Sequence, residues 1–129
     1  MNSKMKNPAG QAVGGAQTAE YEVMNQCLFI HLKQELDHHS AEYIREKSEY
    51  MIDKRHIKNI IFDFTEVNFM DSSGIGVIMG RYKRIHVTGG TVAVTNVSSS
   101  VDRIFRLSGL YKIVKKYITN EDAFEELRV

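Results

Sequence analysis

The sequence lacks the residues that mark several classes of protein. It has one cysteine, one proline and no tryptophan among 129 residues. A single cysteine, Cys27, excludes an internal disulfide and a cysteine-based zinc site. No apolar run approaches the roughly 20 residues that a membrane-spanning helix needs, and no cationic stretch followed by an apolar block opens the chain. We therefore expect a cytoplasmic protein without a signal peptide and without a membrane partner.

Neither sign of charge is in excess. The chain has 17 Lys and Arg residues against 16 Asp and Glu residues, which gives a formal net charge of +1. Because nucleic-acid binders rely on a concentrated cationic surface that releases counterions, direct binding to nucleic acid is not expected. Apolar residues make up 43% of the chain and charged residues 26%, which is typical of one compact globular domain.

The first 17 residues differ in composition from the rest. They hold three of the nine glycines, the only proline (Pro8), and almost no large apolar side chain. Such a segment cannot bury enough surface to offset the entropy lost on ordering. We predict that residues 1–17 form a flexible N-terminal tail and that residues 18–129 form the folded domain.

In the remaining sequence, apolar residues occur either in short runs or at helical spacing. The runs predict strands at 21–24, 27–32, 59–64, 91–97 and 111–117; the helical spacing predicts helices at 40–53, 75–86, 101–107 and from 120 onward, the last with Ala123, Phe124 and Leu127 on its buried side. A serine of the run 98–100 is expected to cap the third helix and Gly109 to end it. The order is ββαβαβαβα. Strands separated by helices pair in parallel through right-handed crossovers, and the first hairpin adds an antiparallel strand. The fold class is therefore α/β, with one mixed sheet and helices packed against it.

The segment from Phe69 to Gly76 carries the strongest candidate for a functional site. It lies past the carboxyl end of a predicted strand, where α/β sheets usually meet ligands and partners. Asp71, Ser72 and Ser73 are all good N-cap residues, so the simplest interpretation is that one of them caps the helix that follows. The alternative is a phosphoacceptor serine, whose phosphate would meet the positive end of the helix dipole.

Enzyme signatures fit the same segment poorly. No Gly-x-x-x-x-Gly-Lys-Ser/Thr string exists, and neither serine has the Gly-x-Ser-x-Gly frame of a hydrolase. Gly74-x-Gly76-x-x-x-Gly80 departs by one residue from the dinucleotide fingerprint, and helix glycines are explained more simply by close approach to another surface. A small nucleotide-binding or hydrolytic α/β enzyme that uses the Ser72–Gly80 turn remains the alternative to a binding protein.

The histidines give no metal signature. His38 and His39 are adjacent and point in different directions, and no helical His-x-x-x-His pair exists, so we expect neither a metal site nor a cofactor. Asp37, just ahead of them, is either a cap for the following helix or a contact for a partner's arginine. Cys27 lies in an apolar strand and is interpreted as an inert core thiol.

Three segments, Glu35–Glu42, Phe69–Lys83 and Leu107–Ile113, resemble the bacterial anti-sigma factor antagonists, which are STAS-domain proteins. The similarity extends from about Tyr21 to Leu127. The Asp-Ser-Ser-Gly block with its Gly-Arg-Tyr-Lys continuation is highly specific for this family, and the Glu-Leu-Asp-His-His block resembles its sporulation type, the antagonists of the anti-sigma F factor. The resemblance implies a mixed sheet covered by helices, in agreement with the order above.

The resemblance also implies a function. Members of the family are binding partners and substrates rather than enzymes. Their anti-sigma factor inhibits a sigma factor and is also an ATP-dependent serine kinase. The unphosphorylated antagonist binds it and releases sigma, whereas the phosphorylated antagonist cannot bind until a metal-dependent serine phosphatase restores it. The implied partners are therefore an anti-sigma factor with serine kinase activity and a serine phosphatase.

Residue by residue, the family's phosphoacceptor, the first serine after the aspartate, maps to Ser72. Its acidic residue in the Glu-Leu-Asp motif, which contacts the kinase, maps to Asp37. The residues expected to bind the partner are Asp37, Asp71, Ser72, Ser73, Gly74, Ile75 and Gly76. The sequence departs from the usual compact members in its 17-residue tail and in the run Ser98–Ser100, neither of which touches the motifs.

Overall fold

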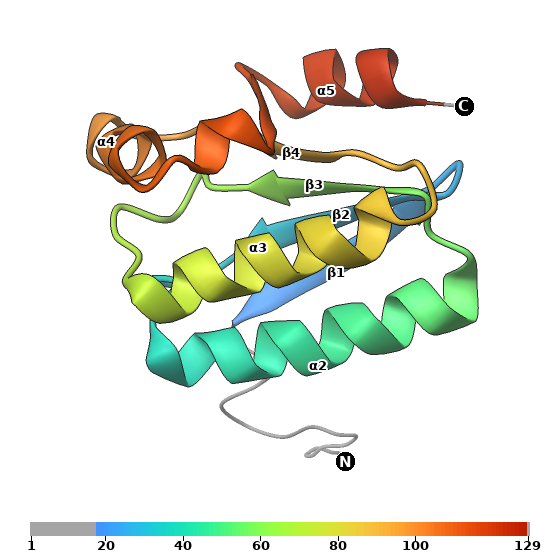
Figure 1. Cartoon of the computed structure of the whole chain (residues 1–129), viewed down its shortest axis with the longest axis horizontal. Helices are drawn as coiled ribbons and strands as arrows, with labels where there is room; N and C mark the ends of the chain where they lie inside the picture. Colours follow the sequence, from blue (N-terminus) through green and yellow to red (C-terminus); the bar gives the residue numbers. More distant parts are fainter. Residues whose placement is uncertain (1–17, 129) are drawn as a thin grey trace.

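The computed structural model describes residues 18–128, which form one five-stranded sheet and its helices (Figure 1). In chain order the elements are β1 (Ala19–Met24), β2 (Cys27–Leu32), α2 (His38–Arg55), β3 (Asn59–Asp63), α3 (Ser72–His86), β4 (Val92–Thr95), α4 (Ser99–Ser108), the 3₁₀ helix η1 (Leu110–Lys112), β5 (Lys115–Tyr117) and α5 (Asn120–Leu127). The predicted α/β class and the order ββαβαβαβα are confirmed, with η1 as an addition.

The strands lie in the sheet in the same order as in the chain, β1-β2-β3-β4-β5. β1 pairs with β2 antiparallel, and the other pairs are parallel. Because each parallel connection moves one strand in the same direction, right-handed crossovers place the connecting helices on one face. α2 and α3 lie side by side on that face, and α5, which follows the last strand, lies on the other (Figure 1).

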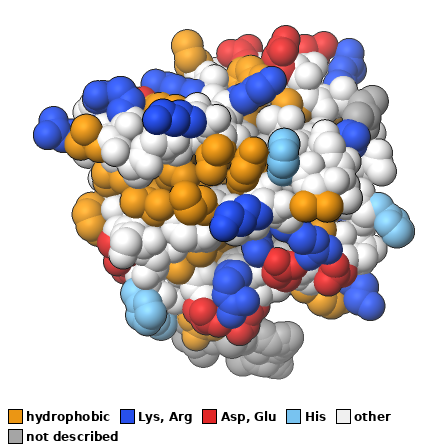
Figure 2. All heavy atoms as spheres, viewed as in Figure 1, with side chains coloured by type: hydrophobic (Ala, Val, Ile, Leu, Met, Phe, Trp, Pro, Cys, Tyr) orange, Lys and Arg blue, Asp and Glu red, His pale blue; other side chains and the backbone are white. Residues whose placement is uncertain are grey.

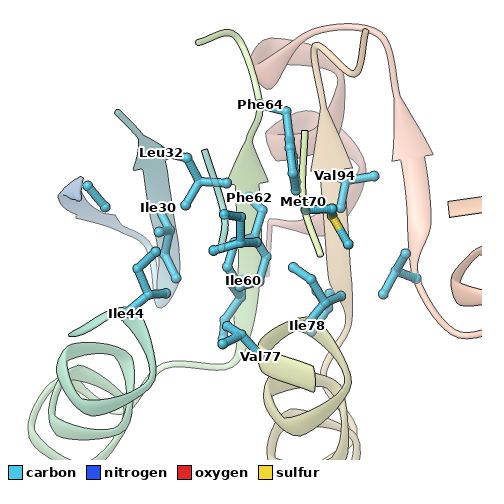
Figure 3. Close-up of a cluster of buried hydrophobic side chains, with 14 of the residues drawn as sticks. Ile30, Leu32, Ile44, Ile60, Phe62, Phe64, Met70, Val77, Ile78 and Val94 are labelled. Carbon is cyan, nitrogen blue, oxygen red and sulfur yellow. The ribbon is translucent and has the colours of Figure 1, made fainter. Parts of the chain in front are cut away.

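The main core lies between the sheet and α2, α3 and α4. Ile30, Ile60 and Phe62 of the central strands meet Ile44 of α2 and Ile78 of α3 there (Figure 3). Central strands covered on both faces read as continuous apolar runs, which is why β2 and β3 were recognisable in the sequence.

A smaller core lies under α5. It joins Cys27, Phe29, Ile61 and Ala93 of the sheet to Ala123 and Leu127 of the helix. Cys27 is fully buried, and burial raises the pKa of its thiol to about 12. The thiol therefore stays protonated and inert, as expected of a core residue.

Two expectations about the C-terminal third are wrong. The strand predicted at 111–117 is β5 alone, because Gly109 (φ 82°) turns the chain into η1. That turn buries Leu110 and Val114. Phe124, expected inside with Ala123 and Leu127, is only half-buried, because α5 leaves part of the sheet uncovered.

Other details of the sequence interpretation are confirmed or lie outside the structure. Ser98 caps α4 by accepting from the Val101 amide, and Gly109 ends that helix in the left-handed conformation. The predicted flexible tail, residues 1–17, lies outside the described residues. Among residues 18–128, no helix is both long enough and apolar enough to cross a membrane.

Candidate partner-binding site

The helices α2 and α3 begin side by side. Leu36 and Met70, which precede the two caps, form a parallel bridge. The Leu36 amide donates to the Phe69 carbonyl at 3.2 Å, and the Asp71 amide donates to the Leu36 carbonyl at 3.2 Å. These bonds bring Asp37 and Asp71, which are 34 positions apart in the chain, to the same end of the helix pair.

Both aspartates are N-caps. Asp37 Oδ1 accepts from the Ser40 amide at 3.0 Å, and Ser40 Oγ accepts from the Asp37 amide at 3.1 Å, which completes a capping box. Hydrogen bonds from Ser40 hold the pKa of the Asp37 carboxyl below its usual value, and the bond from the Ser40 backbone amide has the largest effect. Asp71 Oδ1 accepts from the amides of Ser73 and Gly74 at 2.9 and 3.4 Å. The cap of α3 is therefore Asp71, which leaves both serines free of that role.

A third acid, Glu35, shapes the loop before α3. Its Oε1 accepts from the amides of Asn68 and Phe69 at 2.9 and 3.3 Å. The sequence interpretation assigned Glu35 no role, because nothing in the local sequence shows that a loop 33 residues away supplies unpaired amides.

The two serines differ in environment. Ser72 is exposed, and its hydroxyl has no hydrogen-bond partner among residues 18–128. Ser73 is half-buried, and its Oγ lies 3.3 Å from Nδ1 of His38, the first residue of α2. Consecutive helix positions diverge by about 100°, so Ser73 faces α2 while Ser72 lies on the face that also carries Ile75 and Met79.

Gly74 permits the contact between the two helix starts. A Cβ at Gly74 would lie 2.6 Å from the Leu36 carbonyl oxygen and 2.9 Å from the Leu36 Cγ. At Gly76 and Gly80 a Cβ would meet nothing within 4 Å, so the expectation of close approach is confirmed at Gly74 and wrong at the other two. Gly76 and Gly80 instead border a groove of about 190 Å³ between α2 and α3.

The same glycines do not form a phosphate-binding turn. All three lie within α3, where the Gly74 amide donates to the Asp71 cap and Gly76 and Gly80 lie beyond the first turn, whereas a dinucleotide fingerprint places its glycines in the turn before the helix. This geometry disfavours the alternative in which the Ser72–Gly80 segment binds a nucleotide.

An exposed apolar surface adjoins Ser72. Phe69 is 51% exposed, Met79 of α3 40% and Leu107 of α4 73%. Figure 2 shows apolar side chains gathered on the face between α3 and α4, with Lys and Arg at its margin. Ser100 Oγ donates to the Asn68 carbonyl at 3.1 Å, which ties the start of α4 to the loop before α3. Exposed aromatic and aliphatic side chains grouped in this way are typical of protein–protein contact surfaces.

A buried arginine fixes α3 against α2. Arg81 is 5% exposed and donates to the Arg45 carbonyl at 3.0 Å, to Ser48 Oγ at 2.9 Å and to Glu49 Oε2 at 2.6 Å. Glu49 also pairs with Arg84. The two helices are therefore held in one relative position, and the positions of Asp37 and Ser72 at their starts are held with them.

Of the residues expected to bind a partner, Asp37, Asp71, Ser72, Ser73, Ile75 and Gly76 lie at or near the start of the helix pair with at least part of their surface exposed. Gly74 is buried between them. No group of three or more His, Cys, Asp or Glu side chains in the described part of the chain is placed to hold a metal ion.

Comparison with known proteins gives one consistent family. Residues 18–123 match the STAS domain. The anti-sigma F factor antagonist of Paenibacillus polymyxa is 41% identical over 102 residues, which is 79% of this chain and 87% of that protein. The corresponding antagonist of Lysinibacillus sphaericus is 33% identical over 106 residues, covering 82% of this chain and 90% of that one.

Solved structures agree. The anti-sigma factor antagonist SpoIIAA in its unphosphorylated form has a TM-score of 0.69 and 30% identity, covering 84% of this chain and 96% of that one. The Bacillus cell fate determinant SpoIIAA in its phosphorylated form has a TM-score of 0.69 and 33% identity, covering 85% and 99%. The chain therefore belongs to the STAS domain family, among the anti-sigma factor antagonists.

Proposed function

We propose that this protein is a phosphorylation-switched antagonist of an anti-sigma factor. Its unphosphorylated form binds the anti-sigma factor and frees the sigma factor, and phosphorylation of Ser72 by the same anti-sigma factor, acting as a serine kinase, prevents binding. A serine phosphatase restores the active form. The observation that carries the proposal is the exposed, unpartnered Ser72 hydroxyl at the start of α3, beside an exposed apolar surface.

The relatives support both states of the switch. The two curated relatives are named as anti-sigma F factor antagonists. SpoIIAA, a structural relative at 30–33% identity, exists in an unphosphorylated and a phosphorylated form. A chain with the same fold and an accessible serine in the Asp-Ser-Ser-Gly block is suited to the same cycle.

The surface around Ser72 has the composition of a contact site. Phe69, Ile75 and Met79 supply apolar area, and the carboxylates of Asp37 and Asp71 at its border suit an arginine of the partner. Gly74 contributes by packing, because it allows the start of α3 to meet Leu36. Ser73 and Gly76 extend the surface toward the groove between α2 and α3.

The proposal places the protein in the cytoplasm with protein partners alone. Neither nucleic acid nor a membrane is expected to bind it directly, because its net charge is +1 and Lys and Arg lie only at the margin of the exposed apolar surface (Figure 2).

The test is incubation of the full chain with labelled ATP, with and without its cognate anti-sigma factor. We expect one phosphate per chain only when the anti-sigma factor is present, as measured by intact mass. Nucleotide hydrolysis or self-labelling by the chain alone would instead favour the small α/β enzyme that uses the Ser72–Gly80 turn.

A further inference from the structure

The face of the sheet opposite α2 and α3 is only partly covered. α5 packs on β3, β4 and β5 and also covers Cys27 and Phe29 of β2, but it makes no comparable contact with β1, the edge strand of the β1–β2 hairpin. A pocket of about 400 Å³ lies between α5 and this hairpin, a size within the range of small-molecule sites. It is separated from Ser72 by the sheet, because α3 lies on the other face (Figure 1).

The walls of the pocket are apolar. Phe29 of β2 and Phe124 of α5 approach with their ring centroids 5.8 Å apart and a tilt of 37°. Met24 of β1 completes the wall and is 43% exposed. Phe124 is the side chain that the sequence predicted to be buried. It is half-exposed because it borders the open side of the pocket.

The rim of the pocket is acidic. Glu22 of β1 and Glu121 of α5 line it from opposite sides, and no Lys or Arg is among the described residues that line it. His31 also lines the pocket, with Nε2 3.1 Å from Glu22 Oε1 and Nδ1 2.8 Å from Asp63 Oδ2. Even with that imidazole protonated, the three carboxylates outnumber it by two.

Local structure explains only part of this arrangement. An acid in the first turn of α5 favours the helix dipole, which accounts for Glu121. Glu22 on the facing strand is held by its hydrogen bond with His31. Local structure does not account for Met24 and Phe124, two large apolar side chains that stay partly exposed. Glu121 has no ion-pair partner within residues 18–128, whereas Glu125, further along α5, pairs with Arg128 at 3.1 Å.

We propose that this pocket binds a small organic cation, an amidinium or ammonium group carried on an aromatic or branched apolar body. The body fills the space between Phe29, Phe124 and Met24. The cationic group lies between the carboxylates of Glu22 and Glu121 and against the face of an aromatic ring, where a cation is attracted by the ring quadrupole. The site is independent of the switch at Ser72.

The test compares benzamidine with benzamide, which has nearly the same shape and no charge. Each is titrated into the full ¹⁵N-labelled chain while amide shifts are followed. We expect saturable shifts at residues 22–31 and 120–124 with benzamidine. Benzamide is expected to bind about fivefold more weakly, because it cannot form the exposed ion pair or the cation–π contact. N-acetyl-argininamide is a third probe, which reports whether an arginine side chain of a polypeptide also enters the pocket. Saturable binding at the same residues supports the cation site and identifies a polypeptide side chain as a ligand.

Three variants localise the effect. Glu121→Gln and Phe124→Leu are expected to weaken benzamidine binding severalfold, whereas Glu125→Gln, on the same helix but outside the pocket, leaves it unchanged. Thermal melting checks that each variant is folded. The proposal is overturned if neither benzamidine nor N-acetyl-argininamide gives saturable shifts at these residues, if benzamide binds as well as benzamidine, or if Glu125→Gln weakens binding as much as Glu121→Gln.

Discussion

Ser72 and Ser73 are identical in chemistry and adjacent in the chain, yet only Ser72 has an unengaged hydroxyl. Ser73 is turned toward α2 and lies within hydrogen-bond distance of His38, and Asp71 takes the capping role that either serine could have filled. The sequence alone left open which of the three residues caps α3. The answer depends on the approach of Leu36, which the local pattern does not contain.

This difference predicts the phosphorylated residue. A kinase docked in one pose reaches one direction at the helix start, and Ser72 is the serine that faces solvent. With the anti-sigma factor and ATP, Ser72→Ala is expected to take up no phosphate and Ser73→Ala to take up one, as measured by intact mass. The reverse pattern would reject Ser72 as the acceptor.

Gly74 offers a second prediction at the scale of one residue. Gly74→Ala places a Cβ 2.6 Å from a backbone oxygen that cannot move freely, and we expect it to lower the free energy of unfolding by about 1–3 kcal/mol. Gly80→Ala is the matched control, because its Cβ meets nothing within 4 Å and a helical alanine adds up to about 1 kcal/mol. Urea denaturation of both variants measures the difference, and equal effects would contradict this account of Gly74.

At the scale of the element, the sequence predicted those helices and strands whose burial follows from their own periodicity. β2 and β3 are covered on both faces, and α3 has one apolar stripe, so each shows its pattern locally. The segment 111–117 shows no such local pattern, because its conformation depends on the turn at Gly109 and on the burial of Leu110 and Val114 in the core. Likewise, Asp37 and Asp71 were recognisable as candidate site residues, whereas the role of Glu35 comes from a loop far along the chain.

The pairing of α2 with α3 depends on a buried charge. Arg81 donates to the Arg45 carbonyl, Ser48 and Glu49. Without its guanidinium, Ser48 and the Arg45 carbonyl keep only the bond that they make to each other, and Glu49 keeps Arg84. We expect Arg81→Met to lower the free energy of unfolding by about 2–4 kcal/mol. Arg84→Met removes the other partner of Glu49 from a more exposed position and should cost less than about 1 kcal/mol. Similar losses for both variants in urea denaturation would show that burial of Arg81 does not decide its contribution.

At the scale of the whole molecule, the two faces of the sheet differ in what they carry. The face under α2 and α3 carries the proposed switch at Ser72, and the face under α5 carries a polar network centred on Asp63. That carboxylate accepts from Thr65, Asn96, Asn120 and His31. The network joins β2 and β3 to the residues that follow β4 and β5, so its charge state affects the stability of the entire sheet.

The network predicts a pH dependence of stability. Burial alone would lower the pKa of His31, but hydrogen bonds and charges from Asp63 and Glu22 raise it above its ordinary value. Burial opposes the ionisation of Asp63. The hydrogen bonds that its carboxylate accepts, of which the one from Thr65 has the largest effect, nevertheless hold the pKa of that carboxyl well below its usual range. A raised histidine pKa stabilises the fold below about pH 6.5 and loses that effect as pH rises through the folded pKa. The lowered aspartate pKa stabilises the fold above about pH 4 and loses that effect in stronger acid.

The stabilisation from this pair is therefore greatest between about pH 4 and 6.5 and declines toward pH 8. Since His31 is partly exposed, the decline is expected to be below about 1 kcal/mol. Urea denaturation at pH 6 and pH 8 measures it. His31→Gln should remove the decline, and His86→Gln, which changes an exposed histidine with no carboxylate partner in the described part of the chain, should keep it. Persistence of the decline in His31→Gln would assign it to other groups.

Phosphorylation of Ser72 is expected to release the partner through local charge rather than through refolding of the domain. Phosphate at Ser72 adds about −1.5 to −2 charges next to Asp71 and near Asp37, which the Leu36–Met70 bridge brings to the same end of the helices. In the free chain the phosphate is tolerated, because Ser72 is exposed and the positive end of the α3 dipole faces it. In a complex closed around a neutral hydroxyl, the same charge loses its hydration beside two carboxylates, and a penalty of about 3–4 kcal/mol would weaken binding more than a hundredfold.

Phosphorylated protein and Ser72→Asp are therefore expected to bind the anti-sigma factor more weakly, with circular dichroism and melting temperature close to those of the unmodified chain. Calorimetry in one nucleotide state compares the affinities. Equal affinity of the modified and unmodified chains would refute the mechanism, and a collapsed spectrum would identify unfolding as the cause of release.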